Sequence, residues 1–333
     1  MNKKMRNQLL YPNTENGIYR YEYVMINGIK QYIQVRGKDK KNPILLVLHG
    51  GPGGSLAGLA HVMQDKWEEQ FVVVNWDQRN ACKTYLANKE RASEIAGTGT
   101  IEDYMGDITG IIEWLHTIGD FEKVYLLGFS WGSIIGAEFA KKYPECIAGY
   151  VAVGQLVNFK EGLRFICDKL LAIANEMNKK RDIDLISTGL NNIPRDGKLT
   201  KEFMDSAQKI LVLASRHLAK SGRPFPIKGL LGSPFLNLAE KKTLIFSDYN
   251  LFEGTWKTTL EYDFRQNMNF EVPVLFIYGE EDVSCPSELL QECFDEIKAP
   301  SKKLVVMKEA SHMCFYDQPE KFWEILKDII YRL

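Results

Sequence analysis

The sequence predicts an α/β fold built on a mostly parallel sheet, because short apolar runs alternate with amphipathic helical stretches. The runs show no polar alternation, which is typical of strands that are buried on both faces of a parallel sheet. They are, in chain order, Ile44–Leu48, Phe71–Val74, Val124–Leu127, Ile147–Val153, Val272–Ile277 and Leu304–Met307. Between the second and third runs, apolar residues recur every three or four positions from Ile101 to Ile118, as expected for a helix with one buried face.

The part of the chain before these runs predicts an antiparallel hairpin. Tyr19–Ile26 and Tyr32–Val35 are strand-like and flank Asn27-Gly28, a dipeptide that favours hairpin turns with positive φ. We expect this hairpin to form an antiparallel edge of the sheet.

A long segment without strand-like runs separates Val153 from Val272. Its apolar residues recur with helical spacing instead. They are Leu163, Ile166, Leu170 and Ile173, followed by Phe203, Ala207, Ile210 and Ala214. We therefore divide the chain into an α/β core, residues 1–153 and 263–333, and an inserted helical cap, residues 154–262.

The composition favours a protein that acts on a small molecule or a short peptide. With 333 residues and a formal net charge of -1, the chain has no long-range field that would attract nucleic acid or an anionic membrane. The six cysteines are scattered, which favours reduced thiols and no metal site, and we expect no cofactor. Without a signal peptide or a membrane-spanning apolar stretch, a cytoplasmic protein is expected, and its oligomeric state stays open.

The segment Gly128-Phe129-Ser130-Trp131-Gly132 fits the pattern G-x-S-x-G. It stands between the run Val124–Leu127 and a helical stretch that Pro144 closes. A serine in such a strand-to-helix turn is exposed at the edge of the sheet, and the flanking glycines relieve the crowding of the turn. The helix N-terminus adds a positive dipole near developing negative charge. This context predicts a nucleophile at Ser130 rather than an ordinary turn residue.

A glycine-rich loop, His49-Gly50-Gly51-Pro52-Gly53-Gly54, follows the first apolar run. Enzymes with a nucleophilic serine in a strand-to-helix turn keep at this place the loop that supplies one donor to the oxyanion. We assign the two donors to the backbone N–H groups of Gly51 and Trp131. A phosphate-binding loop is disfavoured, because the P-loop Lys-Ser/Thr and the glycine spacing of dinucleotide-binding loops are both absent.

These motifs resemble those of α/β hydrolases, in which nucleophile, acid and histidine follow one another in that order along the chain. Of the five histidines only His312 lies late enough, in a loop after the last apolar run. Asp282 follows the preceding run and is the expected acid, while Glu280 and Glu281 are expected to be solvated loop residues. The resemblance implies that Ser130 attacks, His312 acts as general base and Asp282 orients the imidazole.

Within that fold, the chain resembles the proline iminopeptidase family over most of the core. The matching segments are His49–Gly54, Trp76-Asp77-Gln78-Arg79, Phe129-Ser130-Trp131, Gly279–Asp282 with Pro286, and His312 with Pro319–Phe322. Two segments depart from the family pattern. Asn80-Ala81-Cys82-Lys83-Thr84 replaces a Gly-x-Gly-x-Ser-like turn, and Phe129 stands where these peptidases favour glycine. Both departures lie near the expected pocket wall, so the resemblance bears on fold and triad more than on substrate.

The family resemblance implies an aminopeptidase that removes a small N-terminal residue, such as proline, from short peptides. The alternatives are an esterase, lactonase or small-amide hydrolase with the same triad, and a ligand-binding protein that has kept the fold without turnover. An aminopeptidase needs a carboxylate for the ammonium group of its substrate. The candidates lie near the ends of the inserted segment and are Glu161, Glu253 and Glu261.

Overall fold

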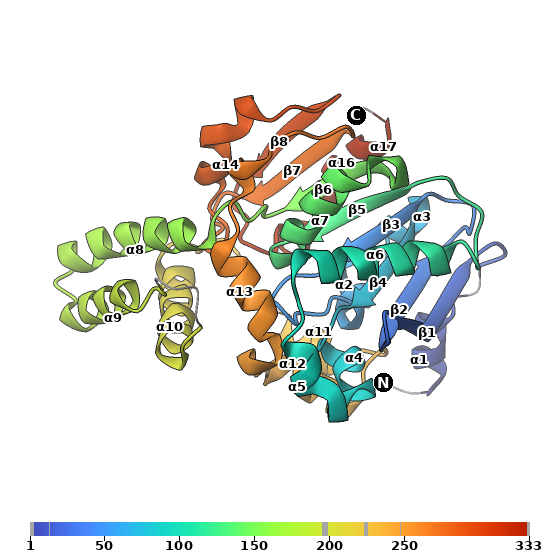
Figure 1. Cartoon of the computed structure of the whole chain (residues 1–333), viewed down its shortest axis with the longest axis horizontal. Coiled ribbons are helices and arrows are strands. Elements are labelled where there is room, and N and C mark those ends of the chain that lie inside the picture. Colours follow the sequence, from blue (N-terminus) through green and yellow to red (C-terminus); the bar gives the residue numbers. More distant parts are fainter. Residues whose placement is uncertain (1–2, 13, 195–198, 223–225, 247, 332–333) are drawn as a thin grey trace.

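The computed structural model describes residues 3–12, 14–194, 199–222, 226–246 and 248–331. Within them, an eight-stranded sheet runs through the molecule in the order β1-β2-β4-β3-β5-β6-β7-β8 (Figure 1). The strands are β1 (Ile18–Ile26), β2 (Ile29–Gly37), β3 (Ile44–Leu48), β4 (Val72–Asp77), β5 (Val124–Phe129), β6 (Ile147–Val153), β7 (Val274–Gly279) and β8 (Lys302–Met307). Strands β3 to β8 pair in parallel, and β2 pairs antiparallel with both β1 and β4. The predicted α/β fold with a mostly parallel sheet is confirmed.

The hairpin at the sheet edge forms around the predicted turn. Asn27 and Gly28 have φ angles of 49° and 74°, and Ile26 pairs directly with Ile29. Two consecutive residues with positive φ match the right-handed twist of the two strands. The second strand therefore begins at Ile29, earlier than the strand-like run at Tyr32, because the backbone ladder continues up to the turn.

Helices cover both faces of the sheet. Leu46 and Leu48 of β3 belong to one hydrophobic cluster together with α6 (Ile101–Leu115) and α7 (Trp131–Lys142). Leu45 and Val47 alternate with them and pack on the other face, against α3 (Trp67–Gln70) and α16 (Pro319–Leu326). Burial on both faces explains why the strand runs are continuously apolar. Strand β8 is an exception, since five of its six residues are partly exposed at the edge of the sheet.

The other helices around the sheet are short and lie in its connections or near its edges. They are α1 (Lys3–Leu10), α2 (Ala60–Met63), α4 (Cys82–Ala87), α5 (Ala92–Ala96), α14 (Ser287–Cys293), α15 (Cys314–Asp317) and α17 (Asp328–Tyr331). Among the described residues, no helix is long and apolar enough to cross a membrane.

Between β6 and Tyr262 the described chain is mainly helical. Its elements are α8 (Phe159–Glu176), α9 (Lys180–Asn191), α10 (Lys201–His217), α11 (Ile227–Leu231), α12 (Leu238–Ile245), the 3₁₀ helix η4 (Tyr249–Phe252) and α13 (Glu253–Glu261). Helices α8, α9 and α10 project away from the sheet (Figure 1) and share a hydrophobic cluster of their own that includes Ile166, Ile186 and Phe203. We use the word cap for these elements, α8 to α13.

Candidate active site

Ser130 lies in a sharp turn between the end of β5 and the start of α7. Its backbone has φ 54° and ψ -119°, a sparsely populated conformation for a residue with a side chain. The Ser130 N–H donates to the carbonyl of Val153 on the neighbouring strand over 2.9 Å. A Cβ atom at Gly132 would lie 2.0 Å from the Leu48 carbonyl oxygen, so this position of the turn accepts only glycine. The local sequence thus builds the turn that G-x-S-x-G predicts.

Asp282 and His312 come from the loops after β7 and β8 and are hydrogen-bonded to each other. His312 Nδ1 lies 2.8 Å from Asp282 Oδ2, and Asp282 Oδ1 accepts from the N–H groups of Ser284 and Cys285, each over 2.8 Å. An imidazole that donates through Nδ1 keeps Nε2 as a proton acceptor. The Phe129 ring packs on the His312 ring, with 4.8 Å between the centroids. The carboxylate and the aromatic ring together orient the imidazole.

The loop after β3 passes close to the serine. A Cβ atom added at Gly50 would lie 2.9 Å from Ser130 Cβ, so glycine allows this approach. Gly51, Ser130, Trp131 and His312 line the same cavity. Within the described part of the chain, the N–H groups of Gly51 and Trp131 have no acceptor in the protein. Ser130 Oγ and His312 make no mutual hydrogen bond there, as is common in sites without substrate.

A buried glutamine links the glycine-rich loop to the side chain of Trp131. Gln78 Nε2 donates to the His49 carbonyl over 2.8 Å, and its Oε1 accepts from Trp131 Nε1 over 3.1 Å. The Gln78 N–H donates to His49 Nε2 over 3.1 Å, while His49 Nδ1 lies 2.8 Å from the Gly50 carbonyl. Complete burial lowers the pKa of His49 to about 4, so its ring is neutral and can accept this bond. The sequence indicated Gln78 only as part of a family motif.

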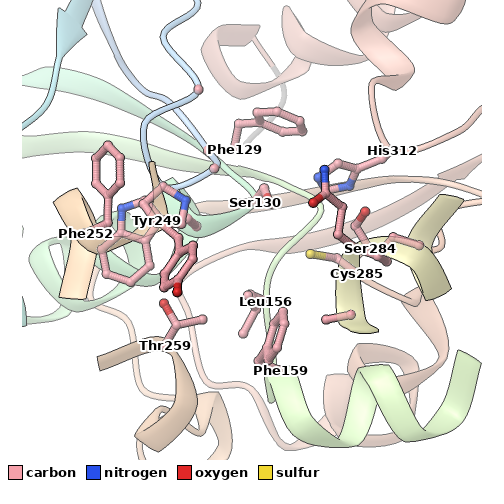
Figure 2. Close-up of a pocket in the computed structure, with 18 of the residues that line it drawn as sticks. Phe129, Ser130, Leu156, Phe159, Tyr249, Phe252, Thr259, Ser284, Cys285 and His312 are labelled. Atoms are coloured by element: carbon pink, nitrogen blue, oxygen red, sulfur yellow. The ribbon is translucent and has the colours of Figure 1, made fainter. Parts of the chain in front are cut away.

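The cavity has a volume of about 590 Å³, and Ser130 lies between its two sides. Figure 2 shows Tyr249 and Phe252 on one side of Ser130, and Cys285 and His312 on the other. Most remaining lining side chains are apolar and come largely from the cap. They include Leu56, Leu156, Phe159, Leu163, Met204, Leu211, Leu230, Leu244, Trp256, Val283 and Met313. Among the described residues that line the cavity, Asp205 of α10 carries the only carboxylate.

The structure does not bring the three cap glutamates to this cavity. Glu161 pairs with Arg265 over 2.8 Å at the surface, and Glu253 and Glu261 are exposed at the ends of α13. Their positions along the chain do lie near the core, but chain position does not determine which way a helical side chain points. The cavity carboxylate, Asp205, lies instead in the middle of the cap sequence.

The two glutamates beside Asp282 behave differently from each other. Glu280 is exposed, as predicted. Glu281 is partly buried and accepts hydrogen bonds from the N–H and the hydroxyl of Ser221, over 2.7 and 2.8 Å. Glu281 thus has a specific partner in the cap, which the sequence did not predict.

No group of three or more His, Cys, Asp or Glu residues in the described ranges is arranged to hold a metal ion. The six cysteines, which all fall in those ranges, are free. The groups that the site itself offers are a serine hydroxyl, an imidazole with its carboxylate, and backbone N–H groups.

The strand order, the serine turn and the loops that carry Asp282 and His312 define an α/β hydrolase fold. Residues 43–177 match the family model described as alpha/beta hydrolase fold. The chain is 27% identical to a probable aminopeptidase, YbaC, of Bacillus subtilis (strain 168), covering 89% of this chain and 92% of that protein. It is 25% identical to a proline iminopeptidase of Thermoplasma volcanium, covering 92% and 95%.

Among solved structures, a proline iminopeptidase-related protein of Thermus thermophilus superposes with a TM-score of 0.64 at 21% identity, covering 94% of this chain and 97% of that one. The protein thus has the α/β-hydrolase fold, and its resemblance to the proline iminopeptidases is confirmed.

Proposed function

We propose that the protein is a serine hydrolase with Ser130 as nucleophile, His312 as general base and Asp282 as the acid that orients it. The observation that carries the proposal is that the serine turn, the Asp282–His312 pair and the loop of Gly51 meet at one cavity. His312 Nε2 takes the proton of the Ser130 hydroxyl while Oγ attacks a carbonyl carbon. The N–H groups of Gly51 and Trp131 stabilise the oxyanion that forms.

The second half of the reaction regenerates the enzyme. The imidazolium of His312 gives its proton to the leaving amine or alcohol, and the acyl group stays on Ser130. A water molecule then attacks the acyl-enzyme, with His312 again taking the proton, and the carboxylic acid leaves. Each step balances without a cofactor.

We further propose that the substrate carries a free amino terminus, as in an aminopeptidase. The names of the similar proteins support this substrate, and so does the position of Asp205 in the lining of the cavity. The Asp205 carboxylate could pair with a substrate ammonium group, while the apolar walls would surround a small apolar side chain. Asp205 lies 2.5 Å from Lys201 and its side chain is 47% exposed, so the substrate would compete with this pair.

A second candidate is a hydrolase of neutral esters or amides with an apolar acyl group. It is favoured by the predominance of apolar side chains in the cavity lining and by the existing pair of Asp205 with Lys201. Such a substrate would need no carboxylate in the cavity.

The test compares free and N-acetylated forms of one aminoacyl-naphthylamide. For an aminopeptidase, acetylation should lower kcat/KM by about 30-fold or more, which corresponds to losing a partly desolvated ion pair. Asp205→Asn should lower kcat/KM for the free amine only, and Glu202→Gln, an exposed residue of the same helix, serves as the matched control. Equal turnover of both substrates would select the ester or amide hydrolase.

Labelling with a fluorophosphonate probe tests the chemistry itself. A nucleophilic Ser130 reacts with the probe, and Ser130→Ala does not. A folded wild-type protein whose Ser130 stays unlabelled would contradict the serine hydrolase and favour a ligand-binding protein.

A further inference from the structure

The segment that departs from the proline iminopeptidase pattern, residues 80–84, lies where the core meets the cap. Asn80 is buried and has a φ of 55°. Its Nδ2 donates to the Leu251 carbonyl of η4 over 2.8 Å and to the Ala92 carbonyl of α5 over 2.9 Å. One core side chain thus holds the backbone of the cap element η4 to the core helix α5.

Three residues further on, Lys83 makes a buried ion pair with the cap helix α12. Lys83 Nζ lies 2.8 Å from Glu240 Oε1, and the two side chains are only 10% and 8% exposed. Glu240 Oε2 accepts the N–H of Asn237, which caps the same helix, over 2.7 Å. The Cys82 thiol also contacts the Glu240 carbonyl, with 3.8 Å between sulfur and oxygen. Both oxygens of the Glu240 carboxylate are therefore engaged.

These contacts act on the elements that form one wall of the cavity. Glu240 precedes Leu244 by one helical turn in α12, and Leu251 precedes Phe252 in η4. Leu244, Phe252 and their neighbour Tyr249 line the cavity, and Figure 2 shows Tyr249 and Phe252 beside Ser130. We use the name latch for Asn80, Cys82 and Lys83 together with their partners Glu240 and Leu251.

We propose that the latch sets the size of the substrate group that the cavity accepts, by holding the wall of α12 and η4 close to Ser130. The proposal rests on the proposed function, because it takes this cavity as the substrate site. A buried ion pair is costly to break on one side, since the remaining charge is left without a partner. Helix α12 therefore keeps its position while both charges are present. Without the latch the wall can move outward, and larger groups gain room that small ones cannot use.

The experiment removes the ion pair of the latch without leaving a buried charge. In Lys83→Met/Glu240→Gln the side-chain volumes stay similar, and glutamine can still cap α12. The ratio of kcat/KM for p-nitrophenyl octanoate to that for p-nitrophenyl acetate should rise about tenfold relative to wild type. Amide hydrogen exchange in residues 238–245 should become faster, because α12 has lost its ion pair with the core.

The matched control changes another ion pair between cap and core. Lys169 of α8 lies 2.7 Å from Glu288 of α14, but these side chains are 45% and 41% exposed. Because exposed pairs contribute little, Lys169→Met/Glu288→Gln should leave both the substrate ratio and the exchange of α12 as in wild type. An equal rise in this control would overturn the assignment of size selection to the latch.

A second variant keeps the test decisive if the first one does not fold. Asn80→Gly removes the bond to Leu251 and suits the positive φ at this position. It should raise the same substrate ratio, by a smaller factor. An unchanged ratio in a folded latch variant would overturn the proposal. If the wild-type protein cleaves no ester or aminoacyl substrate, the proposed function is contradicted instead. Hydrogen exchange then tests the latch by itself, and unchanged exchange in the latch variants would count against it.

Discussion

The floor and the roof of the cavity are held in place by different forces. The floor consists of the lining residues Gly51, Ser130, Trp131 and His312, together with Asp282, which is hydrogen-bonded to His312. These residues follow β3, β5, β7 and β8. Buried hydrogen bonds and close backbone contacts position these residues. The roof consists of the cavity-lining side chains of the cap, which are mostly apolar. Those of α8 and α10 come from helices with a separate hydrophobic cluster. Under the proposed function, the floor performs the chemistry and the roof selects the substrates that fit.

The largest expected effect follows from removing the hydroxyl of the floor. Ser130→Ala should lower kcat by roughly 10⁴–10⁶ and leave the melting temperature nearly unchanged, because the hydroxyl serves chemistry rather than packing. Steady-state kinetics and thermal unfolding measure the two quantities. Ser284→Ala removes another hydroxyl from the cavity lining and should cost far less. Retention of more than about a tenth of the activity by Ser130→Ala would contradict its assignment as nucleophile.

The next largest effect is expected from replacing Asp282, whose carboxylate is hydrogen-bonded to His312 Nδ1. Asp282→Asn should lower kcat by up to about 10⁴, because an amide that donates to Nδ1 selects the wrong tautomer of His312. Glu280→Gln and Glu281→Gln should cost far less, since neither carboxylate contacts the imidazole. Steady-state kinetics of the three variants under one set of conditions measure these changes in kcat. If Glu280→Gln or Glu281→Gln lost most of its kcat while Asp282→Asn lost little, a different carboxylate would serve His312.

A smaller loss of kcat is expected when Gln78, which bonds to His49 and Trp131, is replaced. Gln78→Leu should lower kcat by about 10² with little change in KM, because the oxyanion that we propose Gly51 and Trp131 to stabilise forms only during reaction. Gln64→Leu is the matched control, since Gln64 is equally buried but bonds to Asn75. If Gln78→Leu and Gln64→Leu both lose activity only in proportion to their loss of stability, Gln78 contributes to folding alone.

The glycine-rich loop that carries Gly51 should also make stability depend on pH, through His49. Its folded pKa of about 4 lies below the ordinary value of 6.5, so the unfolded chain binds more protons between these values. The contribution of His49 is therefore present above pH 6.5 and is lost as the pH falls to 4, by about 3 kcal/mol in total.

Burial raises the pKa of Asp77 to about 6, which acts in the opposite direction over much of this range. The difference between wild type and His49→Gln therefore isolates the histidine. Urea unfolding at several pH values measures it, with exposed His116→Gln as the control. A constant difference across this range would contradict the prediction.

The smallest effect is expected in the roof. Met204→Ala removes one apolar side chain of α10 from the cavity lining and should change kcat/KM by less than about tenfold, in a direction that depends on substrate size. A panel of esters and aminoacyl amides of different sizes reveals this dependence. A uniform loss of about a hundredfold or more would mean that the roof takes part in the chemistry, and the division between floor and roof would fail.

Several features could be predicted from the sequence because they depend on local physical rules. Burial on two faces makes strand runs apolar, so β3 and β6 have the predicted bounds. Asn27-Gly28 tolerates the positive φ of a hairpin turn, and the glycines around Ser130 allow the sharp turn after β5. The carboxyl ends of parallel strands lie at one edge, which explains why chain order already placed Asp282 and His312 in neighbouring loops.

Only the tertiary structure decided which side chains face the cavity and which hold it. Glu161, Glu253 and Glu261 are exposed, while Asp205 lines the cavity, because the orientation of each cap helix depends on packing between distant segments. The same holds for the bonds from Gln78 to His49 and Trp131, and for the pair of Lys83 with Glu240, which lies far away along the chain. Local periodicity shows that a residue lies on a helix or after a strand. It carries no information about the partner that a buried polar group meets in the folded protein.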